Sequence, residues 1–314
     1  MTSASLAEWS NLAVYSSMLV LIAALISFAV SFAARGQRVM SPELVSVGAG
    51  AAGPVVAADA PAEALAPGRR AGNIAMALTW LATGLLLVGL VLRGVWAGRV
   101  PWGNMYEFSL AWTLGILAVF LAVSTRRDIR WLGLPVVFLS LLSLGLAVTV
   151  LYTEAAQLVP ALKSWWLVIH VASAIICGGA FTVAAAISVL YLWRDRAERK
   201  GKVTGIVASL PDASRLDTLS YRILAFAFPL WTFAVISGAI WAENAWGRYW
   251  GWDPKETWAF ITWVIYAGYL HARSTAGWRG RRAAYISLIG FVSFLINYFG
   301  VNIFVNSLHS YAGL

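Results

Sequence analysis

The chain has 314 residues, of which 60% are hydrophobic and only 12% are charged, and its mean hydropathy is +0.74. This composition excludes an ordinary water-soluble domain, and repeated apolar runs of about 20 residues predict transmembrane helices. The formal net charge of +9 needs no nucleic-acid partner, because topology and contact with anionic lipid account for it. We therefore predict an all-α polytopic membrane protein.

Eight apolar runs are long enough to cross a bilayer, and in chain order they lie at residues 12–34, 73–95, 106–124, 131–152, 164–193, 220–242, 255–272 and 283–304. The first run is not typical of a cleaved signal peptide, because no Lys or Arg precedes it and it is too long. We expect a first transmembrane helix within 1–35, a flexible cytoplasmic linker at 36–72 and a seven-helix membrane core at 73–314.

The distribution of basic residues predicts the orientation. The segments that follow the first, third, fifth and seventh runs hold 18 of the 23 Lys and Arg residues. The positive-inside rule places these segments in the cytoplasm, so both termini are expected to be extracytoplasmic. The single cysteine, Cys177, leaves the chain without a disulfide or a CxxC pair of its own, and we expect it to pack as a small apolar residue.

The outer segment 241–258 contains the most unusual stretch, WGRYWGWDPKETW at 246–258. Asp253, Pro254 and Glu256 predict a helix start, with an N-cap, a proline in the first turn and a capping-box partner. Helix initiation is a sufficient role for the two acidic residues, and a role in a binding site is the alternative. The sequence leaves both open.

Tryptophan is concentrated in the same region, because six of the 17 tryptophans lie between Trp241 and Trp263. An aromatic belt at the membrane interface explains one or two of them. A dense indole surface beside a rigid helix start is better suited to stacking on a large flat ligand. Arg248 or Lys255 would then be free to meet anionic groups of that ligand.

A flat, anionic and largely apolar ligand suggests haem, whose iron takes axial ligands, and the chain has three histidines. His170 lies near the outer end of the fifth run, and His309 lies in the outer tail. Both fall on the side of the aromatic stretch, so they are candidates to ligate one iron from opposite faces. Taken singly, each has a simpler explanation, as a packing residue in a helix or a solvated residue in a tail.

His271 lies near the cytoplasmic end of the seventh run, roughly 27 Å from Asp253 at 1.5 Å per helical residue. It cannot share an iron with the outer pair, and an interfacial histidine beside Arg273 is the slightly favoured explanation from this chain alone. If His271 binds haem, its fellow ligand must come from another polypeptide. Three histidines on three segments also exclude a di-haem cytochrome b, which needs two pairs.

The stretch 246–258 closely resembles the WWD signature, WGxxWxWDxKExW, of haem-handling membrane proteins. Three further stretches look familiar: ITWVIYAGYLHAR at 261–273, VPWGNMYEF at 100–108 and SWWLVIHVASAI at 164–175. Together they make the chain similar to the CcsA/ResC family of system II cytochrome c biogenesis, called CcsB in some actinobacteria. The resemblance covers nearly all of the chain from about residue 73.

The resemblance implies a cytochrome c synthase that acts with a Ccs1/ResB-type membrane partner in the bacterial plasma membrane. Haem b would cross the membrane and be attached on the extracytoplasmic face to the CxxCH cysteines of apocytochrome c. The resemblance also implies axial ligation by His170 and His309 at the outer site. His271 would ligate haem within the membrane, with the partner supplying the second ligand. Thiol-reducing proteins are further expected partners.

The same resemblance assigns haem contacts to the WWD segment, at Trp241, Trp246, Arg248, Tyr249, Trp250, Trp252, Asp253, Lys255, Glu256 and Trp258. Asn104, Glu107, Trp165 and Trp166 are expected to shape the site, although Glu107 could equally be an ordinary residue at headgroup depth. Two other functions remain open. One is a haem exporter or chaperone that forms no thioether, and the other is a transporter of a different amphipathic substrate.

Overall fold

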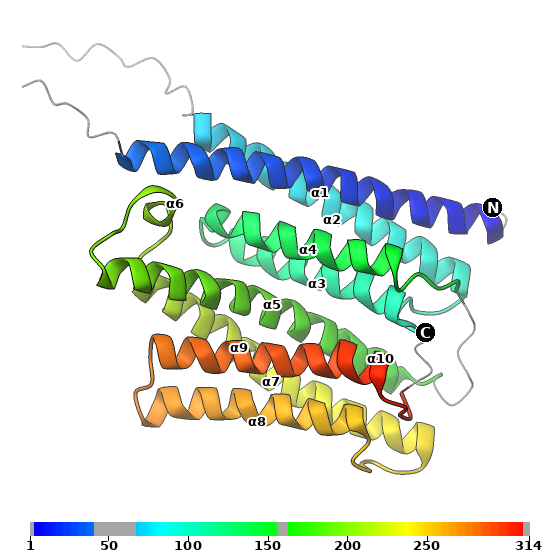
Figure 1. Cartoon of the computed structure of the whole chain (residues 1–314). Coiled ribbons are helices and arrows are strands. Elements are labelled where there is room, and N and C mark those ends of the chain that lie inside the picture. Colours follow the sequence, from blue (N-terminus) through cyan, green and yellow to red (C-terminus); the bar gives the residue numbers. More distant parts are fainter. Residues whose placement is uncertain (1–2, 41–66, 156–162, 310–314) are drawn as a thin grey trace, which may run out of the picture.

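In the computed structural model, which describes residues 3–40, 67–155 and 163–309, long helices lie side by side along one axis (Figure 1). Their bounds are α1 Ser3–Met40, α2 Pro67–Ala97, α3 Met105–Ser124, α4 Gly133–Thr149, α5 Trp165–Arg199, α6 Gly205–Ala208, α7 Ala213–Trp246, α8 Pro254–Thr275 and α9 Arg281–Leu295. The 3-10 helix η1, Arg130–Leu132, precedes α4. The helix α9 continues through the π-helical turn η3, Ile296–Gly300, into α10, Val301–Phe304. The described residues contain no β-strand, and the predicted all-α class is confirmed.

Seven of these helices are long and apolar enough to cross a membrane, counting α4 with η1 and α9 with η3 and α10. The eighth long helix is α8, which lies among the others but carries Lys255 and Glu256 in its first turn and Arg273 in its last. Its 22 residues extend about 33 Å at 1.5 Å per residue, which is enough for the hydrocarbon core. The prediction of about eight transmembrane helices therefore agrees with the structure.

The pair α1 and α2 packs antiparallel through small residues at intervals of seven. Three serines of α1 donate hydrogen bonds to backbone carbonyls of α2: Ser10 to Gly89 at 2.8 Å, Ser17 to Ala82 at 2.8 Å and Ser31 to Gly68 at 2.6 Å. The same register places Ala24 opposite Ala75, and both are fully buried. Small residues let membrane helices approach closely, so they fix this pairing.

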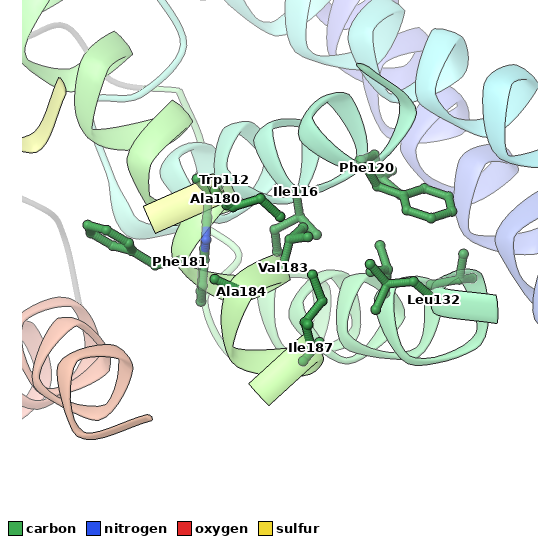
Figure 2. Close-up of a cluster of buried hydrophobic side chains, with 14 of the residues drawn as sticks. Trp112, Ile116, Phe120, Leu132, Ala180, Phe181, Val183, Ala184 and Ile187 are labelled. Carbon is green, nitrogen blue, oxygen red and sulfur yellow. The ribbon is translucent and has the colours of Figure 1, made fainter. Parts of the chain in front are cut away.

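The core of the bundle lies where α3, α4 and α5 meet (Figure 2). Gly179 of α5 faces Gly115 of α3 so closely that a Cβ on Gly179 would lie 2.5 Å from the Gly115 backbone. Apolar side chains fill the space around this contact, namely Trp112, Ile116, Phe120, Leu132, Ala180, Phe181, Val183, Ala184 and Ile187. Cys177 is fully buried in the same cluster, so its predicted packing role is confirmed.

Several helices extend beyond the predicted spans, and α1 already begins at Ser3. The helix α1 continues through Met40 and α2 begins at Pro67, so both ends of the predicted linker at 36–72 are helical, while residues 41–66 lie outside the described part of the chain. The helix α7 begins at Ala213, before the predicted start near 220. Asp212 sets this start, because its side chain accepts the backbone N–H of Arg215 at 2.8 Å.

The bundle has two ends, which we call the aromatic end and the basic end. At the aromatic end α7 meets α8. At the basic end α5 connects to α7 and α8 connects to α9, and there Arg273 pairs with Asp217 at 2.7 Å. The helix α1 starts at the aromatic end, where Asn11 donates a hydrogen bond to Tyr152 at 3.2 Å, and the described tail ends there too (Figure 1). The start of α1 and the tail thus lie at the same end, as an even number of crossings requires.

Candidate functional site

A cavity lies at the aromatic end, between α3, α5, α7, α8 and the last helix. Its empty volume, including the open solvent at its mouth, is about 1130 Å³. The wall is mostly apolar. Its rings are His170, His309, Trp102, Phe108, Trp231, Trp241, Trp246, Tyr249, Trp250, Phe294 and Tyr298.

Helix caps fix the connection between α7 and α8. The helix α7 ends at Gly247, whose φ of 70° is the left-handed conformation that favours glycine. The helix α8 begins after Asp253, whose carboxylate accepts the Lys255 N–H at 3.2 Å, while Glu256 accepts the Asp253 N–H at 3.0 Å. The predicted N-cap, first-turn proline and capping box are confirmed.

Glu256 holds the loop as well as the helix start. Its carboxylate accepts the Gly251 N–H at 2.8 Å and pairs with Arg248 at 3.2 Å. The charge of Arg248 is therefore already compensated. Of the two cations expected to meet an anionic ligand, Lys255 is the one that lines the cavity.

The structure divides the predicted tryptophans into two groups. Trp241, Trp246 and Trp250 line the cavity, and Trp241 is only 1% exposed. Trp252 is 64% exposed, has a φ of 59°, which is rare for a bulky residue, and does not belong to the described lining. Trp258 lies in the second turn of α8, outside the described cavity lining.

His170 is oriented by two residues of α7, the backbone of Ala234 and the ring of Trp241. Its Nδ1 lies 2.7 Å from the carbonyl oxygen of Ala234, and its ring stacks on Trp241 with centroids 6.2 Å apart. Because a carbonyl can only accept, Nδ1 carries the proton and Nε2 of the neutral ring carries the lone pair. Gly238 makes room for this ring, since a Cβ there would lie 2.7 Å from it.

His309 is brought to the same place by Asp253. The carboxylate accepts both His309 Nδ1 and the backbone N–H of Leu308 at 2.9 Å, and so anchors the tail to the start of α8. The ring of His309 meets Trp241 edge-on at 5.7 Å and Trp246 at 4.9 Å. The two predicted outer histidines thus contact one indole, and each is held through Nδ1.

The electrostatics of Asp253 and His309 favour an ionised acid beside a neutral imidazole. Burial opposes ionisation of Asp253, but hydrogen bonds from His309 and Leu308 outweigh it and lower the pKa of this carboxyl to about 2. Burial also lowers the pKa of His309 from its ordinary value, and the contact with Asp253 opposes that effect only in part. A neutral imidazole is the form that binds a metal.

The other predicted site-shaping residues have different places. Asn104 lines the cavity and caps α3, because its side chain accepts the Glu107 N–H at 2.8 Å. Glu107 is fully buried outside the described lining and pairs with Arg93 at 3.1 Å and Arg99 at 2.7 Å, so it holds the outer hairpin together. Trp165 and Trp166 are exposed, and neither belongs to the described lining. A role for these two side chains in shaping the site stays a prediction.

His271 lies apart from the outer pair. It is exposed on α8, one turn before the helix ends at the basic end, and its backbone carbonyl accepts the hydroxyls of Ser274 and Thr275. Within the described residues, no group of three or more His, Cys, Asp and Glu side chains could hold a bare metal ion. Among the described residues, the candidate ligands of a haem iron are therefore individual histidines.

Sequence reasoning missed several residues of the cavity. Gly238 leaves no signal, because its role depends on which helix faces it. Asn297 and Asn302 did offer one, since two amides five residues apart in an apolar helix are unusual and match the wider repeat of a π-helical turn. Both line the cavity beside Tyr298.

The comparisons with known proteins show the family of the chain. Residues 102–309, more than half of the chain, match the family described as Cytochrome C assembly protein. The chain belongs to this family. Relatives named cytochrome c biogenesis protein CcsA include one from Prochlorococcus marinus, 40% identical over 72% of this chain and 80% of its own, and one from Guillardia theta, 37% identical over 75% and 84%. The resemblance to the CcsA family is confirmed.

Among solved structures, the fold matches that of the cytochrome c haem lyase CcmF, with a TM-score of 0.62 and 16% sequence identity. The alignment covers 95% of this chain and 47% of CcmF, so the chain spans about half the length of that protein. At this identity the likeness concerns the fold. The helices of this chain therefore have an arrangement similar to that of helices in CcmF.

Proposed function

We propose that this protein works in cytochrome c biogenesis by binding haem b at the aromatic end and presenting it for attachment to apocytochrome c. The family match supports the process. One observation carries the haem site. Imidazoles from α5 and from the tail, His170 and His309, meet at Trp241 in a mostly apolar cavity.

The residues present fit a porphyrin in three respects. Indoles and phenyl rings line the cavity, as the flat face of the ring needs. Both imidazoles are hydrogen-bonded through Nδ1, which is the usual second-shell arrangement of a histidine that ligates through Nε2. Finally, Gly238 leaves space for His170, which a larger residue would displace.

When bound, haem supplies an iron that takes two axial ligands and vinyl groups that accept the thiols of a CxxCH motif. The chain supplies orientation. His170 and His309 would hold the iron, and the wall of Trp241, Trp246 and Trp250 would exclude water. Because the nucleophiles are the cysteine thiols of the substrate, we assign the acceleration of thioether formation to proximity and orientation.

We further propose that His271 ligates haem at an inner site at the basic end, with the second ligand from a Ccs1/ResB-type partner. Its exposure on α8 supports this, because a second polypeptide can reach it there. The excess of basic residues at the same end supports a cytoplasmic location in a bacterial plasma membrane, which makes the aromatic end extracytoplasmic. Haem then moves outward between the two sites, and thiol-reducing proteins keep the substrate cysteines reactive.

Co-expression of the full chain, the partner and a CxxCH reporter tests this function. We expect reporter-bound haem that survives a denaturing gel, and its loss in His170→Ala and His309→Ala. Trp193→Ala, an exposed tryptophan near the other end of α5, is the matched control and keeps the signal. Haem that copurifies with the protein while the reporter gains none would instead indicate an exporter or chaperone, and absence of haem would indicate another substrate.

A further inference from the structure

One edge of the cavity is polar, although most of the wall is not. Lys255 from the first turn of α8 points at the last helix, where its Nζ donates to Asn302 Oδ1 at 2.6 Å and to the Asn297 backbone carbonyl at 3.4 Å. The same Nζ lies 5.9 Å from the centroid of the Tyr298 ring. Lys255, Asn297 and Asn302 all line the cavity, and we call them the polar edge.

The backbone of the last helix builds this edge. Residues Ile296–Gly300 form a π-helical turn between α9 and α10, and π-helical turns are frequent at functional sites. Tyr298 anchors the turn to α3, because its hydroxyl lies 2.7 Å from Ser109 Oγ and donates to the Met105 carbonyl at 2.9 Å. The position of the polar edge relative to the histidines is therefore fixed by packing.

One feature of the polar edge points to an anionic ligand. Lys255 lines the cavity and has no carboxylate within ion-pair distance among the described residues, whereas Arg248 is paired with Glu256. A partly buried ammonium is costly unless an anionic ligand completes it. Asn297 Oδ1, which is buried without a hydrogen-bond partner in the same part of the chain, is an acceptor and needs a donor instead.

We propose that the polar edge is a carboxylate subsite that binds a haem propionate and so sets the in-plane orientation of the ring. This inference rests on the haem site proposed above. Lys255 supplies the charge, and the side-chain N–H groups of Asn297 and Asn302 donate hydrogen bonds. Because the propionates of haem lie on the half of the ring opposite the vinyl groups, the subsite turns the vinyl half away from the last helix.

Two ligands that differ only at the propionates test this subsite: haem b and its dimethyl ester, in which both carboxylates are methylated. The full-length protein, in detergent and in a His271→Ala background, is titrated with each ligand and followed by absorption. We expect Lys255→Met to weaken haem binding about tenfold or more, as loss of a charged hydrogen bond does, and to leave ester binding within about twofold. Lys202→Met at the basic end is the control.

Asn302→Leu is measured in parallel, so the test does not depend on one variant. We expect a smaller loss for haem than in Lys255→Met, and again none for the ester. Equal weakening of both ligands by Lys255→Met would overturn the subsite, while an intact two-histidine spectrum would leave the haem site standing. If the His271→Ala protein without any further substitution binds neither ligand, both proposals are overturned.

Discussion

Asp253 shows how much a single residue can combine. The sequence predicted its role as the N-cap of α8, because Asp, Pro and Glu at this spacing form a local pattern. The contact with His309 was not predictable in the same way, since it joins residues far apart in the chain and depends on where the tail packs. The structure therefore gives one carboxylate two roles, between which the sequence could not choose.

Replacing Asp253 by Asn separates these roles. Asn is nearly as good an N-cap, so α8 should start as before, but His309 loses its ionised acceptor. We expect haem affinity to fall about tenfold and the haem reduction potential to rise, because a less polarised imidazole donates less to ferric iron. A redox titration measures the shift, with Asp212→Asn, the N-cap of α7 at the basic end, as control. An unchanged potential would show that Asp253 serves the helix alone.

Gly238 tests the placement of the other histidine. In Gly238→Ala the new methyl group would lie 2.7 Å from the His170 ring and force it off the Ala234 carbonyl. We expect the haem spectrum to lose most of its six-coordinate character. Gly268→Ala on α8 is the matched control, because a Cβ there has no neighbour within 4 Å. The account is contradicted if both variants keep the spectrum of the unsubstituted protein.

At the scale of elements, the apolar runs predicted each long helix, because the bilayer demands about 20 apolar residues whatever the neighbours are. The pairing of these helices was not predictable. The register of α1 on α2 rests on Ser10, Ser17 and Ser31, whose spacing gains meaning only beside the small residues of α2. The π-helical turn η3 likewise makes contacts that the sequence does not show, because Tyr298 bonds to Met105 of α3 and Lys255 of α8 donates to Asn297.

The α1–α2 pair can be loosened without touching the cavity. In Gly89→Leu the side chain would meet Val14 and the Ser10 backbone, and overpacking of this kind costs about 1–3 kcal/mol. We expect a lower midpoint of thermal unfolding in detergent and an unchanged haem spectrum in the folded protein. Gly84→Leu on the same helix, where a Cβ meets nothing within 4 Å, should leave the midpoint unchanged. Equal midpoints for the two variants would disprove the close register.

At the scale of the whole molecule, the bundle separates two regions of different chemistry. The cavity and both outer histidines lie at the aromatic end, and His271 lies at the basic end with most of the positive charge. The sequence predicted this separation, because it follows from alternation of loops across a membrane. It could not predict the cavity, because the residues that line it come from five helices far apart in the sequence.

Orientation in the membrane can be measured with single cysteines. Cys177 is buried and should not react, so it needs no replacement. Trp165→Cys at the aromatic end should react with a membrane-impermeant maleimide in intact cells, whereas Lys202→Cys at the basic end should react only after the membrane is opened. The reverse pattern would place the aromatic end in the cytoplasm and contradict the proposed direction of haem movement.

The central claim is that His170 and His309 hold one iron from its two faces. Its most direct test is the absorption spectrum of the haem-loaded, full-length protein in a His271→Ala background, so that only the outer site contributes. We predict a low-spin, six-coordinate spectrum, which becomes five-coordinate in His170→Ala or His309→Ala and is restored by added imidazole. A spectrum that stays six-coordinate when both histidines are replaced would contradict the claim.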